Sequence, residues 1–177
     1  QNDQEAIIVY SNGSNYPLYR IWNSTNKSIS NVKVINNTYT GGGRIGWIDL
    51  VEMTSNTGAN EIALLMRHEG GDDLSAIIWN ATNSTWGCNK TINTALEAAT
   101  YEFKDFGGAF IKGKNQLFVA ASQVSTNIVT ANKTLDACNW KVSGATASTE
   151  AAGLLDVASD EIGNSTCIVV ANAGAST

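Results

Sequence analysis

The feature that most constrains this chain is an internal repeat. The apolar segment 61–66, Glu-Ile-Ala-Leu-Leu-Met, has counterparts at 5–10, 116–121 and 166–171, so the copies start 56, 55 and 50 residues apart. A second segment recurs at 18–23 and 74–80 and more weakly at 127–132, and each copy ends at the Asn of an Asn-x-Thr triplet. A third carries Asp49, Asp105 and Asp156 at one matching position. Because three separate segments recur together, we interpret them as copies of one structural unit.

The repeated segments predict an all-β fold. Each is a short apolar run bounded by Gly, Asn, Ser or Thr, which is the pattern of a strand between turns, and the copy from 61 to 106 contains four such runs. Four short strands in a unit of this length are typical of a propeller blade. We predict one β-repeat domain over 1–177, with units at approximately 5–59, 60–114 and 115–163 and a partial unit at 164–177. The alternative is a β-sandwich or jelly roll.

The repeat resembles those of secreted and cell-surface β-propeller proteins, in which a strand ending in Trp-Asn is followed by Ser-Trp and by a strand carrying Asp. The resemblance covers essentially the whole chain. It implies an architecture more than a function, since such repeats serve adhesion, surface scaffolding and glycan recognition. The third unit lacks the Trp of the second strand, so we expect its blade to be irregular.

Three units and one opening strand are too few to close a ring of four to eight blades. We therefore expect a piece of a larger protein, an assembly of several chains, or an open array covered by a neighbour. The apolar run 167–170 would be an exposed strand edge, which suits strand addition to another subunit. We hypothesise an extracellular filament or layer in which the end of one chain completes the sheet of the next.

Charge excludes one class of partner. Only 15% of the residues are charged, the net charge is -5, and no basic cluster occurs, whereas phosphate binding needs clustered Lys and Arg. We therefore expect no nucleic-acid partner. No apolar run approaches the roughly 20 residues of a membrane-spanning helix, so no membrane span is expected.

Asn-x-Ser/Thr triplets predict that the chain is exported and N-glycosylated. The triplets fall mostly at predicted turns and strand ends, although an Asn- and Thr-rich sequence produces some of them by chance. The candidate asparagines are Asn12, Asn23, Asn26, Asn36, Asn80, Asn83, Asn89, Asn132 and Asn164.

Three cysteines allow one disulfide in an oxidising compartment. Our candidate pair is Cys138 with Cys167, which would join the third unit to the strand after it, and the equal alternative is that Cys88 and these two are small buried hydrophobic residues. Their spacing fits no zinc motif, and the sequence has a single His. We expect neither a metal site nor a cofactor.

No constellation of residues predicts catalysis. His68 stands alone in a predicted loop, and Asp72 and Asp73 lack the alternating spacing of a calcium loop. The recurring aspartates appear once in each unit, which favours a structural hydrogen bond to a turn over an active site. We expect that the protein is not an enzyme.

Tryptophans are the remaining candidates for ligand contact. Trp22 and Trp79 match in the repeat and are expected to fill the space between blades. Trp86 and Trp140 have no counterpart in every unit and are weak candidates for a sugar-binding platform. The predicted function is structural or adhesive at the cell surface, with self-association, other surface proteins or glycans as partners. The alternative is a carbohydrate-binding or glycan-cleaving propeller.

Overall fold

The computed structural model describes most of the chain, and apart from one 3-10 turn its regular elements are β-strands. The described residues are 5–35, 43–54, 60–70, 73–93, 104–123, 127–143, 146–147, 152–160 and 167–173. All of the strand pairs are antiparallel. The prediction of an all-β fold built from small antiparallel sheets is confirmed.

The described strands form four sheets that follow one another along the chain. The first sheet contains β1 (Glu5–Tyr10), β2 (Leu18–Asn23), β3 (Ser28–Ile29) and β4 (Lys33–Val34), with β3 and β4 both beside β2. The second sheet has the order β5 (Ile45–Thr54), β6 (Asn60–His68), β7 (Asp73–Asn80) and β8 (Thr85–Asn93). The third sheet contains β9 (Phe106–Ile111), the 3-10 turn η1 (Lys112–Lys114), β10 (Gln116–Gln123), β11 (Asn127–Thr134), β12 (Lys141–Val142) and β13 (Thr146–Ala147). The fourth sheet pairs β14 (Ala152–Ser159) with β15 (Cys167–Ala173).

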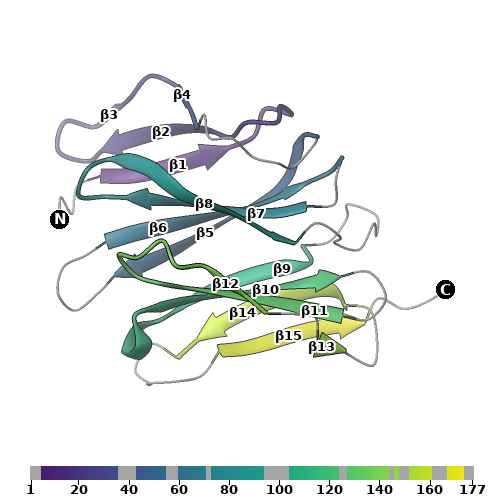
Figure 1. Ribbon diagram of the computed structural model, residues 1–177. Helices are drawn as coiled ribbons and strands as arrows, with labels where there is room; N and C mark the ends of the chain where they lie inside the picture. Colours follow the sequence, from purple (N-terminus) through teal and green to yellow (C-terminus); the bar gives the residue numbers. More distant parts are fainter. Residues whose placement is uncertain are drawn as a thin grey trace.

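The sheets stack in chain order. Figure 1 shows the first sheet at the top, the second below it, and the third and fourth at the bottom. Separate apolar clusters fill the first–second, second–third and third–fourth interfaces. The stack is open within the described ranges, where no ring is closed, so the propeller arrangement stays a prediction.

The sheets group the strands differently from the sequence units. The strand expected to end each unit pairs with the strand expected to open the next one, since β5 pairs with β6, β9 with β10 and β14 with β15. A sequence period gives the length of a repeating unit but not the strand with which it begins. The first sheet therefore lacks a counterpart of β5 among the described residues.

The strand register shows the repeat directly. Asn23 pairs with Glu5, and Asn80 pairs with Glu61, with a four-residue turn after each Asn. The third sheet departs from this pattern, because Asn132 pairs with Phe118 and the connection to β12 is longer. In the third sheet the residue that corresponds to Glu61 is therefore Phe118. The sequence comparison had aligned Gln116 with Glu61, two residues earlier.

Neighbouring sheets pack through alternate faces of their strands. In the second sheet one face packs against the first sheet and the other against the third. The side chains toward the first sheet include Leu64, Met66, Ile77 and Trp79, and those toward the third include Ala63, Leu65, Ala76 and Ile78. Each fully buried Leu or Ile stabilises the fold by about 1.5–3 kcal/mol relative to an exposed one, so these two interfaces are the core of the protein.

A pair of glycines lets the third sheet approach both neighbours. An ideal Cβ on Gly107 would lie 2.8 Å from the backbone nitrogen of Val157, and one on Gly108 would lie 2.8 Å from Cδ1 of Leu65. β9 therefore passes between the second and fourth sheets at a distance that a side chain would prevent.

Ion pairs also connect the sheets, and they explain the recurring aspartates. The Lys104 Nζ lies 2.7 Å from Oδ2 of Asp49 and 3.8 Å from Oδ1 of Asp156. The guanidinium of Arg67 lies 2.8 Å from Asp105 Oδ2, and both side chains are buried. The aspartates have structural contacts, as expected, but the contacts are ion pairs between sheets rather than hydrogen bonds to turns.

The disulfide joins Cys88 on β8 to Cys138 in the connection after β11, with 5.3 Å between the two Cα atoms. The predicted pair of Cys138 with Cys167 is therefore wrong. The long connection of the third sheet folds back over β8 of the second sheet, while Cys167 opens β15 opposite Ser159 in the fourth. Sequence spacing gave no information about this fold-back.

Candidate functional site

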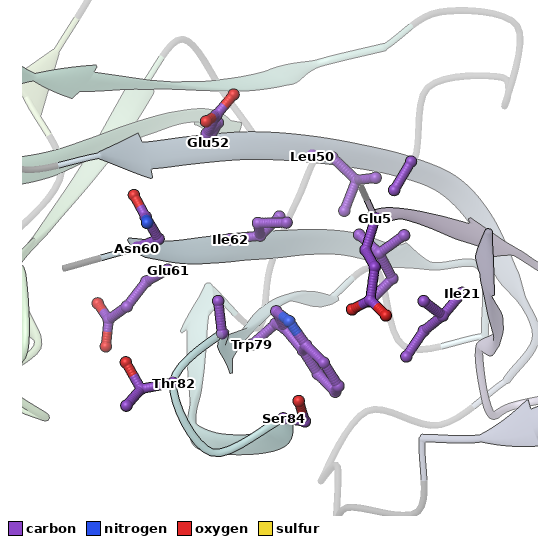
Figure 2. A pocket seen from close by; sticks show the side chains of 13 residues that line it. Glu5, Ile21, Leu50, Glu52, Asn60, Glu61, Ile62, Trp79, Thr82 and Ser84 are labelled. Carbon is purple, nitrogen blue, oxygen red and sulfur yellow. The ribbon is translucent and has the colours of Figure 1, made fainter. Parts of the chain in front are cut away.

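A cleft of about 660 Å³ opens between the first and second sheets. Its apolar part is formed by Ile7, Ile21, Leu50, Ile62 and Trp79. Its polar part is formed by Glu5, Glu52, Asn60, Glu61, Thr82 and Ser84. In Figure 2 the indole of Trp79 lies between Glu61 on one side and Ile21 and Glu5 on the other. The volume of this cleft and its mixture of apolar and polar lining residues are typical of sites that bind small molecules.

Local structure explains why these residues meet. Glu5 and Glu61 occupy the same position at the start of β1 and β6. The turn after β7 forms part of the rim, and Asn80 holds it because its Oδ1 accepts hydrogen bonds from the backbone N–H groups of Thr82 (3.0 Å) and Asn83 (3.3 Å). This side-chain hydrogen bonding to the following backbone is the reason that Asn favours such turns.

The cleft is acidic. None of its described lining residues is Lys, Arg or His. Glu5 and Glu52 are exposed, whereas Glu61 is buried and accepts a hydrogen bond from Nζ of Lys133 at 2.7 Å. Two carboxylates are thus accessible above an apolar floor, an arrangement suited to a neutral or cationic ligand that carries hydrogen-bond donors.

The next interface has a smaller cleft, in which Glu61 and Ile78 are the counterparts of Glu5 and Ile21 in the first. Between the second and third sheets the cleft measures only about 230 Å³. Lys133 follows Asn132 as Ala81 follows Asn80, and its ammonium reaches Glu61, the counterpart of Glu5. The first cleft is the larger one, and it has the methyl group of Ala81 where the second has the side chain of Lys133.

The predicted ligand-contact tryptophans lie elsewhere. Trp86 packs against Tyr19 and Trp79, with ring centroids 5.7 and 5.3 Å apart. The Nε1 of Trp140 donates to the carbonyl oxygen of Cys88 at 2.9 Å. Neither lines the cleft. Trp79, which was expected in the core, is both 7% exposed and part of the cleft floor.

Sequence reasoning did not single out the acidic lining residues. Glu5, Glu52 and Glu61 are spread over β1, β5 and β6 and share no motif. One signal was present in the repeat, because Glu5 and Glu61 stand at the same position of matching segments.

The described glycosylation candidates lie in connections between strands (Asn12, Asn26 and Asn83), at the ends of β2 and β7 (Asn23 and Asn80) and within β8 and β11 (Asn89 and Asn132). Asn12, Asn26, Asn83 and Asn89 are exposed, and Asn23, Asn80 and Asn132 are half-buried. Asn36 and Asn164 lie outside the described residues. The Oδ1 of Asn23 accepts from the N–H groups of Thr25 and Asn26 just as that of Asn80 accepts from its own turn.

His68 was predicted to lie in a loop, and this prediction is wrong. It is the buried last residue of β6. Its Nε2 lies 2.7 Å from the hydroxyl of Ser75. Burial lowers the pKa of His68, and this effect is opposed by the charge of Asp73 and by a hydrogen bond with the Gly43 backbone. Asp73 begins β7 beside it, and Asp72 lies outside the described residues. These contacts make His68 part of the packing at one end of the second sheet.

The described part of the chain lacks two features of other kinds of functional site. It contains no group of three or more His, Cys, Asp or Glu side chains placed to hold a metal ion. It also contains no helix of the length and hydropathy needed to cross a membrane.

Comparisons with known proteins find similarity to solved structures but not to a family model or a curated protein. No family model matches the sequence, and no curated protein matches it. Among solved structures, a triple arginine-to-alanine mutant of AofleA from Arthrobotrys oligospora is similar, with a TM-score of 0.46 and 14% identity. The match covers 93% of this chain and 48% of that one, so this chain spans about half the length of the neighbour.

Proposed function

We propose that this chain is an exported, N-glycosylated repeat protein with a structural or adhesive role at the cell surface, and that its stacked sheets are blades of a propeller-like array. The observation that carries the proposal is the position of the triplet asparagines, three of which, Asn12, Asn26 and Asn83, are exposed in the connections between strands. Glycans there would not disturb the packing between sheets. The disulfide between the second and third sheets supports export, because such bonds persist in oxidising compartments.

Secretion from a eukaryotic host tests the glycosylation. We expect an intact mass above that of the polypeptide, which falls after enzymatic removal of N-glycans. Asn83→Gln should remove the mass of one glycan, whereas Asn15→Gln, at an exposed Asn outside any triplet, should leave the mass unchanged. Secreted protein with the bare polypeptide mass would overturn the glycoprotein assignment.

A second candidate function is carbohydrate binding in the first cleft. The cleft favours it because sugars present hydroxyl donors to carboxylates and apolar C–H faces to aromatic rings, and both kinds of group line this site. The role would be adhesion through surface glycans rather than glycan cleavage.

The smaller cleft of the next interface suggests the test. Ala81→Lys introduces the side chain that Lys133 supplies in the second cleft, so specific signals on a glycan array should disappear. Ser24→Lys is the matched control, because Ser24 follows Asn23 as Ala81 follows Asn80 and does not line the cleft. Both changes keep the Asn-x-Thr triplet. Glycan signals that survive Ala81→Lys would place the ligand elsewhere.

A further inference from the structure

The first sheet has an apolar outer face, which we define as the side of the sheet that carries Ile8, Arg20, Trp22, Ile29 and Val34. Leu18, Arg20 and Trp22 alternate along β2 and therefore share one face of the sheet. Their partners on the neighbouring strands, Val34, Ile8 and Ile29, lie on the same face. Ile8, Trp22, Ile29 and Val34 are 43%, 39%, 47% and 54% exposed. Trp22 was expected in the core, so this exposure corrects that prediction.

The repeat shows what this face does in the other sheets. Trp79 is the counterpart of Trp22, and Leu64 is the counterpart of Ile8. Both are buried beneath the preceding sheet, at 7% and 0% exposure. The third sheet repeats the arrangement, with Ala121 buried against the second sheet.

The fourth sheet carries the complementary free face. Leu155 and Val157 pack toward the third sheet, so Asp156 and Ala158, which alternate with them on β14, lie on the opposite side. Both are exposed, and the side chain of Asp156 is 72% accessible. Its counterpart Asp49 lies on the side of the second sheet that faces the third, where it contacts Lys104.

We propose that the outer face of the first sheet packs against the free face of the fourth sheet of a second copy of this chain. The contact continues the stacking already present three times within the chain. Charge also matches, because Arg20 lies within the outer face and its Nε has no hydrogen-bond partner among the described residues. Asp156 lies on the opposing sheet, where its contact with Lys104 is long, at 3.8 Å, and leaves its side chain 72% accessible. This inference rests on the proposed structural role and names its partner.

Such a contact joins two different surfaces and therefore propagates head to tail, as a ring or a filament. It differs from the edge-to-edge strand exchange expected from the sequence, since it uses sheet faces rather than the edge of β15, which has no second partner strand among the described residues.

Sedimentation of the 177-residue chain and two blocked variants tests the contact. Ile8→Lys places a charge on the outer face, and Ala158→Lys places one on the free face of the fourth sheet. Each variant alone should lose all oligomers and sediment as a monomer. Val142→Lys, at an apolar residue of β12 that is 40% exposed, should associate like the wild type.

Mixing the two blocked variants identifies the occupant. An equimolar mixture should form dimers that do not extend, because each variant supplies the face that the other has lost. A monomeric wild type, association of either variant alone, or a mixture that stays monomeric would each overturn the inference. Thermal melts of each variant confirm that the monomer is folded. The glycan-mass measurement is independent of this result, so failure of the contact is distinguishable from failure of the proposed function.

Discussion

Replacing Lys133 by Met should destabilise the protein more than any change of a surface lysine. The side chains of Lys133 and Glu61 are 1% and 7% exposed, and the Nζ lies 2.7 Å from Oε2. The ammonium also donates to the carbonyl oxygen of Thr134 at 3.0 Å, and the same carboxylate oxygen accepts from the backbone N–H of Asp136 at 3.3 Å. Met fills a similar volume, so the substitution removes the charge and leaves the carboxylate in place.

The structure sets the expected magnitude. Removing one partner of a buried ion pair costs about 3–5 kcal/mol, because the other charge stays buried without compensation. Glu61 keeps one backbone donor and borders both clefts, which give it access to water. We therefore expect the lower end, about 3 kcal/mol, which corresponds to about 6–12 °C in melting temperature for a chain of this length.

Urea unfolding followed by tryptophan fluorescence measures this loss. Lys90→Met, at an exposed lysine on β8, is the control and should stay within about 0.5 kcal/mol of the wild type. The double variant Glu61→Gln with Lys133→Met should recover most of the stability, since it leaves no unpaired charge. A loss below about 1 kcal/mol for Lys133→Met, or a double variant no more stable than the single one, would refute the reasoning.

Three further predictions concern other parts of the core. Converting both Cys88 and Cys138 to Ser should cost about 2–4 kcal/mol, because the bond closes a loop with a sequence separation of 50; an unchanged urea midpoint under non-reducing conditions would contradict this. Since burial holds the pKa of His68 below its usual 6.5, the unfolded state takes up the proton first as pH falls. The free energy of unfolding should therefore decrease below about pH 6.5, and His68→Gln should flatten that part of the pH profile; equal slopes for both proteins would exclude the effect. Gly107→Ala should cost about 1–3 kcal/mol by forcing β14 away from β9, whereas Gly87→Ala, with no atom within 4 Å of the new Cβ, should be neutral in the same thermal melt.

Local sequence pattern was enough to predict the longer strands, the turns after Asn23 and Asn80, and the burial of Trp79, but not the two-residue strands β3, β12 and β13. It was not enough to group the strands into sheets, because the length of a repeat does not show which strand begins a sheet. β5 pairs with β6, the strand that follows it, and so belongs to the second sheet rather than the first. The two-residue shift of the third sheet was hidden for a related reason. A shift of two residues keeps the same side chains on each face of a strand, so the alternation of β10 does not reveal it, and the pairing with β11 does.

The disulfide and the cleft between sheets were beyond prediction. The link between Cys88 and Cys138 depends on how the long connection of the third sheet folds back, which no local signal encodes. The cleft likewise depends on side chains from three strands that meet only after the first two sheets have packed. The repeated Glu at positions 5 and 61 was visible, but its meaning depends on which residue faces it from the next sheet.

The difference between Ala81 and Lys133 has a consequence for how such a chain diverges. Duplicating a sheet also duplicates the cleft beside it. A single substitution can then determine whether a side chain of the protein fills that cleft or a ligand can enter it. One junction can thus gain rigidity while its neighbour gains the capacity to recognise something, without any change to the backbone of either.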